Sequence, residues 1–340
     1  MINYPIFPVT IEQKKIINDF NNDKSISYQI IKCEICNSED YKHLFNNDCW
    51  GFKQKLVYCK KCGFCFLNPR MDKESSSLFY NSDSYRSVYF NHNIKDTEDL
   101  YQKLFNQVKK HIPAEKKIPN YNKYYNSLYF DFINYNIKDY ENVLDIGCGN
   151  GTKLIDFKNI GKKVTGVDLS SICHRIHTEF GINSIEGSID DLENKKYDLV
   201  ILSHVLEHLT SLEKITKKLS NLTNKYLYIE VPTHLKRLQV IQNAHNYYFT
   251  ENTLNFFILN SNFELIDLKY VKSGKSGEYI LALYKKQKTK NKKKFEFNFN
   301  SEIKKINYLY LKFLFKQLIK KIILKKQISG LFVKIFNFRN

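Results

Sequence analysis

The stretch that decides the fold is VLDIGCGNG, which runs from Val143 to Gly151. It opens as an apolar run broken only by Asp145, as expected of a strand buried in a parallel sheet. Gly147, Gly149 and Gly151 then permit a tight turn and a close approach of a ligand to the backbone. A helix is expected to follow directly, so its free N–H groups and positive dipole end would face that ligand.

The segments around this turn alternate between short apolar runs and amphipathic stretches, which is the pattern of βαβ units. Strands are expected at Lys163–Asp168, Tyr197–Ser203 and Tyr226–Pro232. Two later apolar runs, NFELIDLKYV and EYILALYK, flank the Gly/Ser turn KSGKSG and predict an antiparallel hairpin. The fold class is therefore α/β, with a parallel sheet closed by an antiparallel hairpin.

Two acidic residues suggest which ligand the glycine turn holds. A glycine run alone would also fit a nicotinamide cofactor. Asp145, however, lies two residues before the first glycine, where it would repel a pyrophosphate but can hold an ammonium group. Asp168 ends the next strand, about twenty residues after the glycines, where an acid can accept hydrogen bonds from both ribose hydroxyls. The pair favours S-adenosylmethionine over a dinucleotide.

With these motifs in order, the chain resembles the class I S-adenosylmethionine-dependent methyltransferase superfamily. YDLVILSHVLEHL (Tyr197–Leu209) resembles the fourth motif of the branch that includes ubiquinone-type O-methyltransferases. The resemblance implies a Rossmann-like seven-stranded methyltransferase sheet. It also implies a set of cofactor-binding residues, namely Asp145, Gly147, Gly149, Gly151, Asp168, Leu169, Ser188, Ile189 and Ser203.

One cofactor motif departs from the family pattern. In GSIDDL, from Gly187 to Leu192, relatives often carry Asp at the second position to hold the adenine amine, whereas this chain has Ser188. The Ser188 hydroxyl with the backbone N–H of Ile189 can serve instead, and Asp190 or Asp191 can compensate.

Cysteine spacing near the N-terminus predicts a metal site. Cys33 with Cys36 and Cys59 with Cys62 form two C-x2-C knuckles, the pattern of a zinc ribbon with four protein ligands and a structural role. The segment MINYPIFPVT is not a secretory leader, so disulfides are not expected. Cys49 and Cys65 are spare, and Cys65 is an alternative ligand to Cys62. The run CKKCGFCFLNPR resembles the zinc-binding N-terminal segment of bacterial methyltransferases that act on sugars and surface glycans, including deoxysugar C-methyltransferases.

Catalytic candidates follow the third strand, where ligands of such sheets bind. His204, Glu207 and His208 would share one face if this segment were helical. His245 lies in AHNYYFT, which resembles the H-x3–4-F stretch of ubiquinone-type O-methyltransferases. Some relatives carry Glu-x-x-Glu-His and a later His as a divalent-metal site, and here His204 replaces the first acid. Three hypotheses stay open: a catalytic divalent metal, a lone histidine base (His204 or His245), and purely structural histidines.

Positive charge is concentrated in the C-terminal segment. The net charge is +18, and Lys285–Asn340 holds seventeen Lys/Arg against two Asp/Glu. Beyond Ser301 the pattern predicts a basic amphipathic helix, which docks on the protein or, alternatively, lies on an anionic membrane surface. No stretch is apolar enough to span a bilayer, so we expect a cytoplasmic protein, with the inner face of the membrane as a peripheral location.

These patterns divide the chain into five parts. The predicted boundaries are 1–30 for an N-terminal segment, 31–70 for the zinc module, 71–136 for a helical and aromatic lid region, 137–284 for the methyltransferase core and 285–340 for the basic tail. In the lid region, Phe79, Tyr80, Tyr85 and Tyr89 either cover the acceptor or simply pack the helical layer.

The leading hypothesis is an enzyme that O-methylates a sugar or glycan-linked acceptor in surface polysaccharide biosynthesis. C-methylation of a nucleotide-activated sugar is the first alternative. A zinc-ribbon RNA methyltransferase or nucleic-acid binder is the second, disfavoured because the basic charge belongs to the tail rather than to the expected active site.

Overall fold

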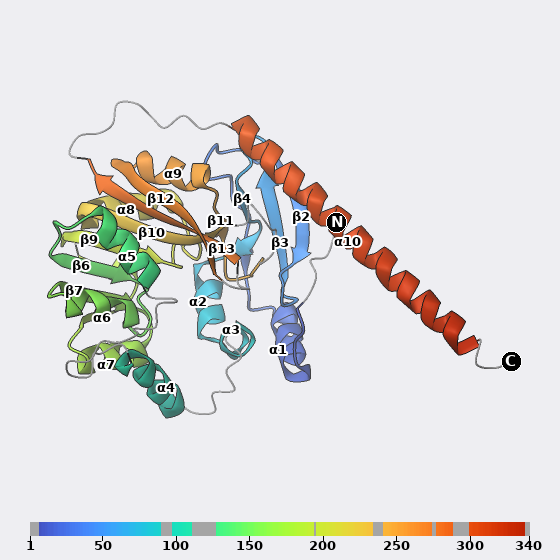
Figure 1. The fold of residues 1–340 in the computed structure, drawn as a ribbon, viewed down its shortest axis with the longest axis horizontal. Helices are drawn as coiled ribbons and strands as arrows, with labels where there is room; N and C mark the ends of the chain where they lie inside the picture. Colours follow the sequence, from blue (N-terminus) through green and yellow to red (C-terminus); the bar gives the residue numbers. More distant parts are fainter. Residues whose placement is uncertain are drawn as a thin grey trace.

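A mixed seven-stranded sheet forms the centre of the molecule (Figure 1). The structure is a computed structural model that describes residues 7–89, 97–110, 127–193, 195–233, 241–273, 277–287 and 299–336. The strand order is β12-β13-β10-β9-β6-β7-β8. The strands are β6 Asn142–Ile146, β7 Lys163–Asp168, β8 Asn183–Glu186, β9 Tyr197–Ser203, β10 Thr223–Thr233, β12 Phe263–Ser273 and β13 Gly277–Lys286.

The sheet confirms the predicted fold class. β6 pairs in parallel with β7 and β9, and β10 pairs in parallel with β9. β13 is antiparallel to both β10 and β12, as predicted for the hairpin, although the turn residues 274–276 lie outside the described residues. Strand order reverses between β6 and β9, and their carboxyl ends therefore open a crevice where a ligand can bind.

Alternating side chains of the strands feed two hydrophobic cores on opposite faces of the sheet. One core joins the strands to helices α4 Thr97–Lys109, α5 Ser127–Asn136, α6 Thr152–Asn159 and α7 Ser171–Glu179. The other joins them to α8 Leu212–Leu222 and α9 Glu251–Leu259 and also includes Cys33, Cys59 and Cys62. The cysteine module and the sheet therefore share a core.

The cysteine module is built on a small antiparallel sheet. Its strands are β2 Tyr41–Asn47, β3 Lys53–Cys59 and β4 Cys65–Leu67, and β11 Tyr247–Tyr248 joins β4 from the distant C-terminal half. A further pair, β1 Tyr28–Gln29 and β5 Arg70–Met71, lies beside helices α1 Ile11–Asn22, α2 Lys73–Asn81 and α3 Asp83–Tyr89. The sequence predicted no strands in this module.

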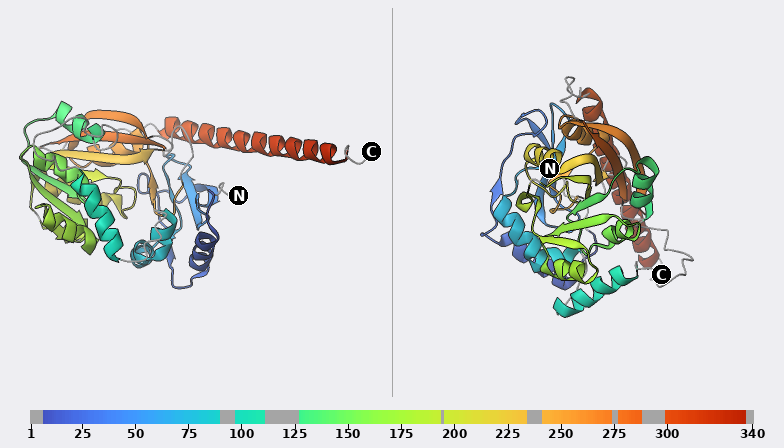
Figure 2. Two further views of the ribbon diagram at one scale, coloured as in Figure 1. Left: turned by 60° about the horizontal axis from the view of Figure 1, so that its bottom comes forward. Right: turned by 90° about the vertical axis from the view of Figure 1, so that its left-hand side faces the viewer.

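The C-terminal helix α10 spans Phe299–Phe336 and projects away from the rest of the molecule (Figures 1 and 2). Its first turns pack on the module: Ile306 and Leu309 are buried in a core with Phe45, and Tyr58 donates a hydrogen bond to Asn307. This supports docking on protein for the start of the helix. Among the described residues, no helix has an apolar stretch long enough to cross a bilayer.

Candidate functional site

The glycine turn adopts a backbone that only glycine takes up easily. Gly147, Gly149 and Gly151 have φ values of 68°, 55° and 78°. A Cβ atom at Gly147 would come within 2.5 Å of Val205 Cγ2, and one at Gly151 within 2.8 Å of His177 Cδ2. At Gly149 a Cβ atom would meet no atom of the described residues within 4 Å. The turn is therefore tight on its protein side and open on its outer side, as a ligand cradle requires.

Asp168 lies at the mouth of this turn. Its Oδ2 accepts a hydrogen bond from the backbone N–H of Gly149 at 2.9 Å, and its Oδ1 accepts one from Ser170 N at 3.0 Å. The next residue, Leu169, is 71% exposed. The Asp168 carboxylate and the exposed apolar side chain of Leu169 therefore lie next to each other beside the glycine turn.

A cleft of about 390 Å³ opens beside the turn. Its lining residues are Gln107, Asp145, Gly147, Cys148, Gly149, Asn150, Thr152, Lys153 and Ser203. Asp145 is 2% exposed, and its Oδ2 has no hydrogen-bond partner among the described residues. Burial raises the pKa of Asp145 to about 7; Lys153 opposes this rise, and Asp168 and Glu230 add to it. A buried carboxylate with an unpaired oxygen is suited to binding a cationic group.

Two charged residues at this cleft were missed by the sequence reasoning. Lys153, in the first turn of α6, donates hydrogen bonds to Ser203 Oγ and, at 3.2 Å, to Glu230 Oε2. Ser203 in turn donates to the same carboxylate oxygen at 2.6 Å. The available signal was a lone Glu near the end of the apolar strand YLYIEVP and a Lys two residues after the last glycine. Neither pattern shows that the two side chains meet.

His204 connects this cluster to the catalytic candidates. It has a left-handed φ of 57°, and 40% of its side chain is exposed. Its Nε2 lies 3.3 Å from Glu230 Oε1, and its Nδ1 lies 3.6 Å from Glu207 Oε1. Burial disfavours the charged ring, but the two carboxylates outweigh it and raise the pKa of His204 to about 9. The condition that 204–208 be helical is not met, because the segment is a loop with a turn at 206–208.

Glu207, His208 and His245 come together despite the absence of a helix in this described loop. One potential ligand atom from each lies within 4.8 Å of the others. Glu207 is fully buried, and within the described part of the chain neither of its carboxylate oxygens has a hydrogen-bond partner. His208 Nδ1 lies 2.8 Å from Ala244 O, which can only accept, and 2.8 Å from the Tyr80 hydroxyl, and the carbonyl contact favours a proton on Nδ1. Nε2 of His208, 4.0 Å from Glu207 Oε1, therefore keeps a lone pair directed toward the carboxylate.

Ser188 and Ile189, which the sequence predicted to contact the adenine ring, mainly make contacts within the protein. Ser188 begins a short 3₁₀ turn, Ile189–Asp191, and its backbone N–H and hydroxyl both donate to Asp191 Oδ2 at 2.8 Å. Ile189 is buried at 3% exposure. Asp190 forms an exposed ion pair with Lys73 at 3.4 Å. The hydroxyl of Ser188 is thus already occupied within its own turn.

The aromatic residues of the lid region divide into two groups. Phe79 is fully buried, and the Tyr89 hydroxyl donates to Asp48, so these two pack the core beneath the lid region. Tyr80 instead reaches the candidate site, because its hydroxyl lies 2.8 Å from His208 Nδ1. Tyr85 packs against Tyr80 with ring centroids 4.8 Å apart.

The four predicted cysteine ligands form one cluster. Their sulfur atoms lie within 4.8 Å of one another, with Cys33 Sγ 3.4 Å from Cys62 Sγ and Cys36 Sγ 3.4 Å from Cys59 Sγ. Tetrahedral zinc with Zn–S bonds of about 2.3 Å needs sulfurs about 3.8 Å apart, which these positions approach. Cys65 belongs to β4 and is outside the cluster.

The two knuckles also share one backbone geometry. Asn37 N donates to Cys33 O at 2.8 Å, and Gly63 N donates to Cys59 O at 2.7 Å. Both donor residues have positive φ, 57° for Asn37 and 80° for Gly63. Two equivalent turns that each present a pair of thiols are what a metal site with four cysteine ligands requires.

Comparison with known proteins identifies the sheet and its glycine turn. Residues 121–268 match the sequence profile of the family described as "Methyltransferase domain". Residues 121–268 therefore form a methyltransferase domain, in agreement with the S-adenosylmethionine-dependent methyltransferase expected from the sequence. The matched range includes the glycine turn, Asp168 and the loop after β9, but excludes the four-cysteine module and α10.

Curated relatives of the methyltransferase domain are ubiquinone biosynthesis O-methyltransferases. The protein of Rickettsia bellii (strain OSU 85-389) is 31% identical over 85 residues, which are 23% of this chain and 35% of the relative. That of Bradyrhizobium sp. (strain ORS 278) is 35% identical over 75 residues, 20% of this chain and 30% of the relative. The chain thus spans about a third of the length of the curated relatives it matches.

Solved structures with a similar domain include the 1,6-didemethyltoxoflavin-N1-methyltransferase of Burkholderia thailandensis. It is 16% identical, with a TM-score of 0.43, and the match covers 66% of this chain and 96% of that one. The magnesium protoporphyrin IX methyltransferase of Synechocystis PCC 6803 is 15% identical, with a TM-score of 0.41, and the match covers 62% of this chain and 97% of that one.

Proposed function

We propose that this protein transfers the methyl group of S-adenosylmethionine to a hydroxyl of a sugar or glycan-linked acceptor. The observation that carries the cofactor half of the proposal is the cleft beside the glycine turn, which Asp145 lines, with the Asp168 carboxylate bound to the turn at Gly149 N. The resemblance of the cysteine module to those of sugar and surface-glycan methyltransferases supports the acceptor half.

Each cofactor group has a suitable counterpart at this cleft. Asp145 is placed to pair with the methionyl ammonium, and Asp168 to accept hydrogen bonds from the ribose hydroxyls. Gly147 and Gly149 line the cleft together with Ser203, and the glycine turn lets the backbone approach the ligand. Leu169 and Ile189 supply apolar surface for the adenine ring, and the Ile189 N–H takes the role predicted for it while Ser188 holds the turn.

Methyl transfer breaks the carbon–sulfur bond of the sulfonium and forms an oxygen–carbon bond, leaving a neutral thioether. The reaction is an in-line displacement, so much of the rate comes from alignment. The acceptor hydroxyl must also lose its proton. The loop after β9 begins directly after Ser203, which lines the cleft, and this closeness supports a role for its side chains toward the acceptor.

We propose that Glu207, His208 and His245 hold a divalent metal ion there, with His204 as the fourth member of the set. The buried carboxylate of Glu207, its closeness to His208 and His245, and the lone pair of His208 Nε2 support this choice over the lone-base hypothesis. Two imidazoles and a carboxylate suit Mn²⁺ or Zn²⁺, and such an ion would lower the pKa of a bound hydroxyl.

Glu207→Gln should lower kcat by about 100-fold or more, because it removes the charge that balances the metal, while cofactor affinity stays unchanged. Methyl transfer and S-adenosylmethionine binding are measured on the same preparation, together with the content of metal beyond the cysteine-bound ion. Glu213→Gln, an exposed glutamate in the first turn of α8, is the matched control. If the Glu207→Gln variant kept its full kcat, Glu207 would have no role in binding a catalytic metal. If the enzyme were active without this metal and lost activity on substitution of His204, the histidine-base hypothesis would be supported instead.

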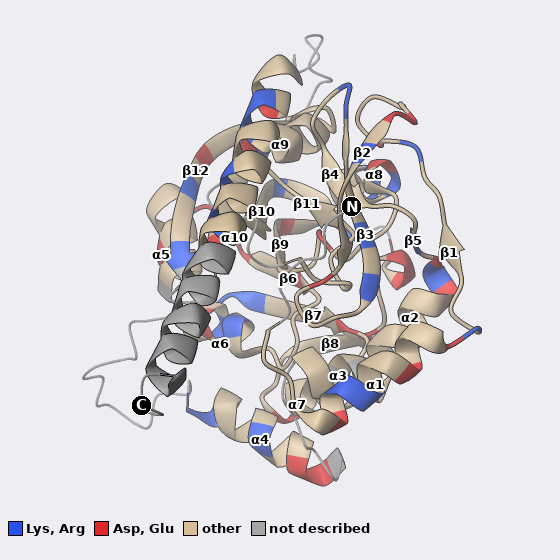
Figure 3. Ribbon diagram, turned by 90° about the vertical axis from the view of Figure 1, so that its right-hand side faces the viewer, with Lys and Arg blue, Asp and Glu red and all other residues tan. Residues whose placement is uncertain are grey.

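The C-terminal helix extends the proposal toward a lipid-linked acceptor. Beyond the docked turns, Leu311, Phe315 and Leu318 are exposed, at 64%, 64% and 55%. No Asp or Glu follows Glu302 in the sequence, whereas Lys and Arg recur to the end. In Figure 3 the described part of α10 carries blue segments, with red only near its start. A cationic, partly apolar helix is suited to an anionic lipid surface, and this location stays a prediction.

Incubation with S-adenosylmethionine labelled in its methyl group tests the proposal as a whole. Nucleotide sugars, lipid-linked glycan extracts and RNA are offered in parallel, and labelled sugar hydroxyls are the expected product. Label on a sugar carbon would replace O-methylation by C-methylation, and label on RNA would overturn the acceptor assignment. Absence of cofactor binding at millimolar S-adenosylmethionine would overturn the cofactor assignment itself.

A further inference from the structure

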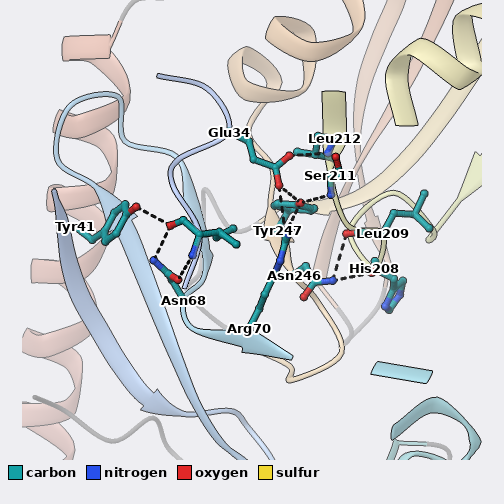
Figure 4. Close-up of polar contacts among 11 residues, drawn as sticks. Glu34, Tyr41, Asn68, Arg70, His208, Leu209, Ser211, Leu212, Asn246 and Tyr247 are labelled. Carbon is teal, nitrogen blue, oxygen red and sulfur yellow. Dashed lines mark hydrogen bonds and ion pairs between the residues drawn. The ribbon is translucent and has the colours of Figure 1, made fainter. Parts of the chain in front are cut away.

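Glu34 lies inside the first cysteine knuckle, between Cys33 and Cys36, yet it does not face the metal position. Its side chain is 17% exposed and points toward the methyltransferase domain, where Figure 4 shows it among residues from three distant segments. Glu34 Oε2 accepts a hydrogen bond from the backbone N–H of Leu212 at 2.6 Å. Oε1 accepts one from the Tyr247 hydroxyl at 2.5 Å and one from Arg70 Nη1 at 3.3 Å.

Leu212 is the first residue of α8, the helix that follows the candidate catalytic loop. The residue before it, Ser211, has a left-handed φ of 63° and makes no side-chain capping bond to the described residues. The Ser211 N–H donates to the Tyr247 hydroxyl at 3.2 Å. Glu34 therefore supplies the capping acceptor that Ser211 does not provide at this helix start, and its negative charge adds to that of Glu213 in the first turn.

Asn246 and Tyr247 also hold the loop that follows β9, through hydrogen bonds to its carbonyl oxygens. The backbone N–H groups of Asn246 and Tyr247 lie 2.8 and 3.3 Å from the carbonyl oxygen of Glu207. The Asn246 side-chain amide donates to His208 O at 2.8 Å and to Leu209 O at 3.3 Å. Tyr247 and Tyr248 form β11, which pairs with β4 of the cysteine module. The loop is thus tied to the module directly where α8 begins and, through β11, at residues 207–209.

We propose that Glu34 is a positioning residue through which the four-cysteine site fixes the loop that carries His204, Glu207 and His208. The inference rests on the proposed function for the role of that loop in methyl transfer. Metal binding orders the knuckle, the ordered knuckle places Glu34, and Glu34 fixes the start of α8 and the hydroxyl of Tyr247. The module accordingly contributes to catalysis without touching either substrate.

Because Glu34, Arg70 and Tyr247 are largely buried, the contacts among them are expected to form or break together. Arg70 is 6% exposed, and its Nε has no hydrogen-bond partner in the part of the chain that the structure describes, so Glu34 is the carboxylate that balances its charge. Removing one member of a buried ion pair leaves the other charge uncompensated, which is strongly unfavourable. The Tyr247 ring also lies 5.5 Å from the Arg70 guanidinium and stacks on Phe64 of the module. Displacement of Glu34 must therefore release several contacts together.

Hydrogen exchange of the full-length, metal-loaded protein tests the proposal. In Glu34→Ala, backbone amides of 204–212 should exchange about 10- to 100-fold faster, as expected when hydrogen bonds to a charged group are lost. Glu39→Ala is the matched control, because Glu39 belongs to the same module but forms an exposed ion pair with Lys32. The cysteine site should keep its metal ion in both variants, since neither residue is a ligand.

Tyr247→Phe is the second variant, because it keeps the ring packing and removes only the hydroxyl that joins Glu34 to Ser211. It should loosen the same amides by a smaller factor and lower kcat while leaving the affinity for S-adenosylmethionine unchanged. Unaltered exchange of 204–212 in both variants would overturn the proposal. Faster exchange in a protein that binds no S-adenosylmethionine would instead refute the proposed function and leave the coupling intact.

Discussion

Asp145→Asn is expected to bind S-adenosylmethionine about 100-fold more weakly than the unaltered protein, because a hydrogen-bonded charge pair with the methionyl ammonium is lost. The substituted asparagine would keep the shape of the side chain at a position that is only 2% exposed. Isothermal titration calorimetry at pH 7.5 measures the difference. Asp198→Asn is the matched control, because Asp198 accepts backbone N–H bonds from Glu141 and Asn142 at the opposite end of the sheet.

The pH dependence of binding gives this prediction a second readout. Burial, the first cause, raises the pKa of Asp145 to about 7, so its carboxylate is mostly protonated at pH 6 and mostly ionised at pH 7.5. Because the ammonium pairs only with the ionised form, affinity should rise about tenfold over that range and be lost again as the pH falls. Asp145→Asn should flatten the profile. Equal affinity of variant and parent, or a profile that survives the substitution, would remove Asp145 from the cofactor site.

The geometry of the proposed cofactor site was predictable from the sequence because its parts are local. Gly147 to Asp168 is one strand–helix–strand unit, and in such a unit the ends of two adjacent parallel strands must lie at the same edge. The hydrogen bond between Gly149 N and Asp168 Oδ2 follows from that geometry. The paired C-x2-C knuckles were predictable for the same reason, since each presents two thiols from a single turn.

The connections between these units could not be predicted, because they depend on tertiary placement. Glu34 reaches residues 178 and 213 positions away, and Lys153 meets Glu230 across 77 positions. No local period indicates such pairs. In the loop after β9 a local pattern was misleading. The spacing of three and four residues suggested a helical face, but His204 has a left-handed backbone and lies close to both Glu207 and Glu230. A two-residue strand, β11, was equally invisible because it exists only through its pairing with β4.

Because the core is shared, a metal ion bound at the cysteine site would also support the methyltransferase domain outside the cysteine segment. Cys33, Cys59 and Cys62 belong to the same hydrophobic cluster as strand residues Leu144 and Val200. Gly63, directly after the last ligand, comes so close to the start of α10 that a Cβ atom there would lie 3.0 Å from Glu302. Loss of the metal is therefore expected to affect the sheet, the catalytic loop and the docked end of α10 together.

Cys62→Ser should abolish zinc binding at the cysteine site and lower the melting temperature by about 10 °C or more, because binding energy of a structural zinc is folding energy. The substituted hydroxyl is a poor ligand, and the three remaining thiols cannot close a four-coordinate site. Zinc content by mass spectrometry and thermal unfolding by circular dichroism measure the two effects. Chelator treatment of the unaltered protein should reproduce them.

Cys65→Ala is the matched control for this experiment. Cys65 is buried three positions after Cys62, but its sulfur lies toward the Gly63 carbonyl rather than in the cluster. The variant should keep its zinc at the cysteine site and lose only the modest stability expected from a small cavity. If Cys65→Ala lost the metal while Cys62→Ser retained it, Cys65 would be the fourth ligand, and the turn geometry at Gly63 would have to change to bring its sulfur to the other three.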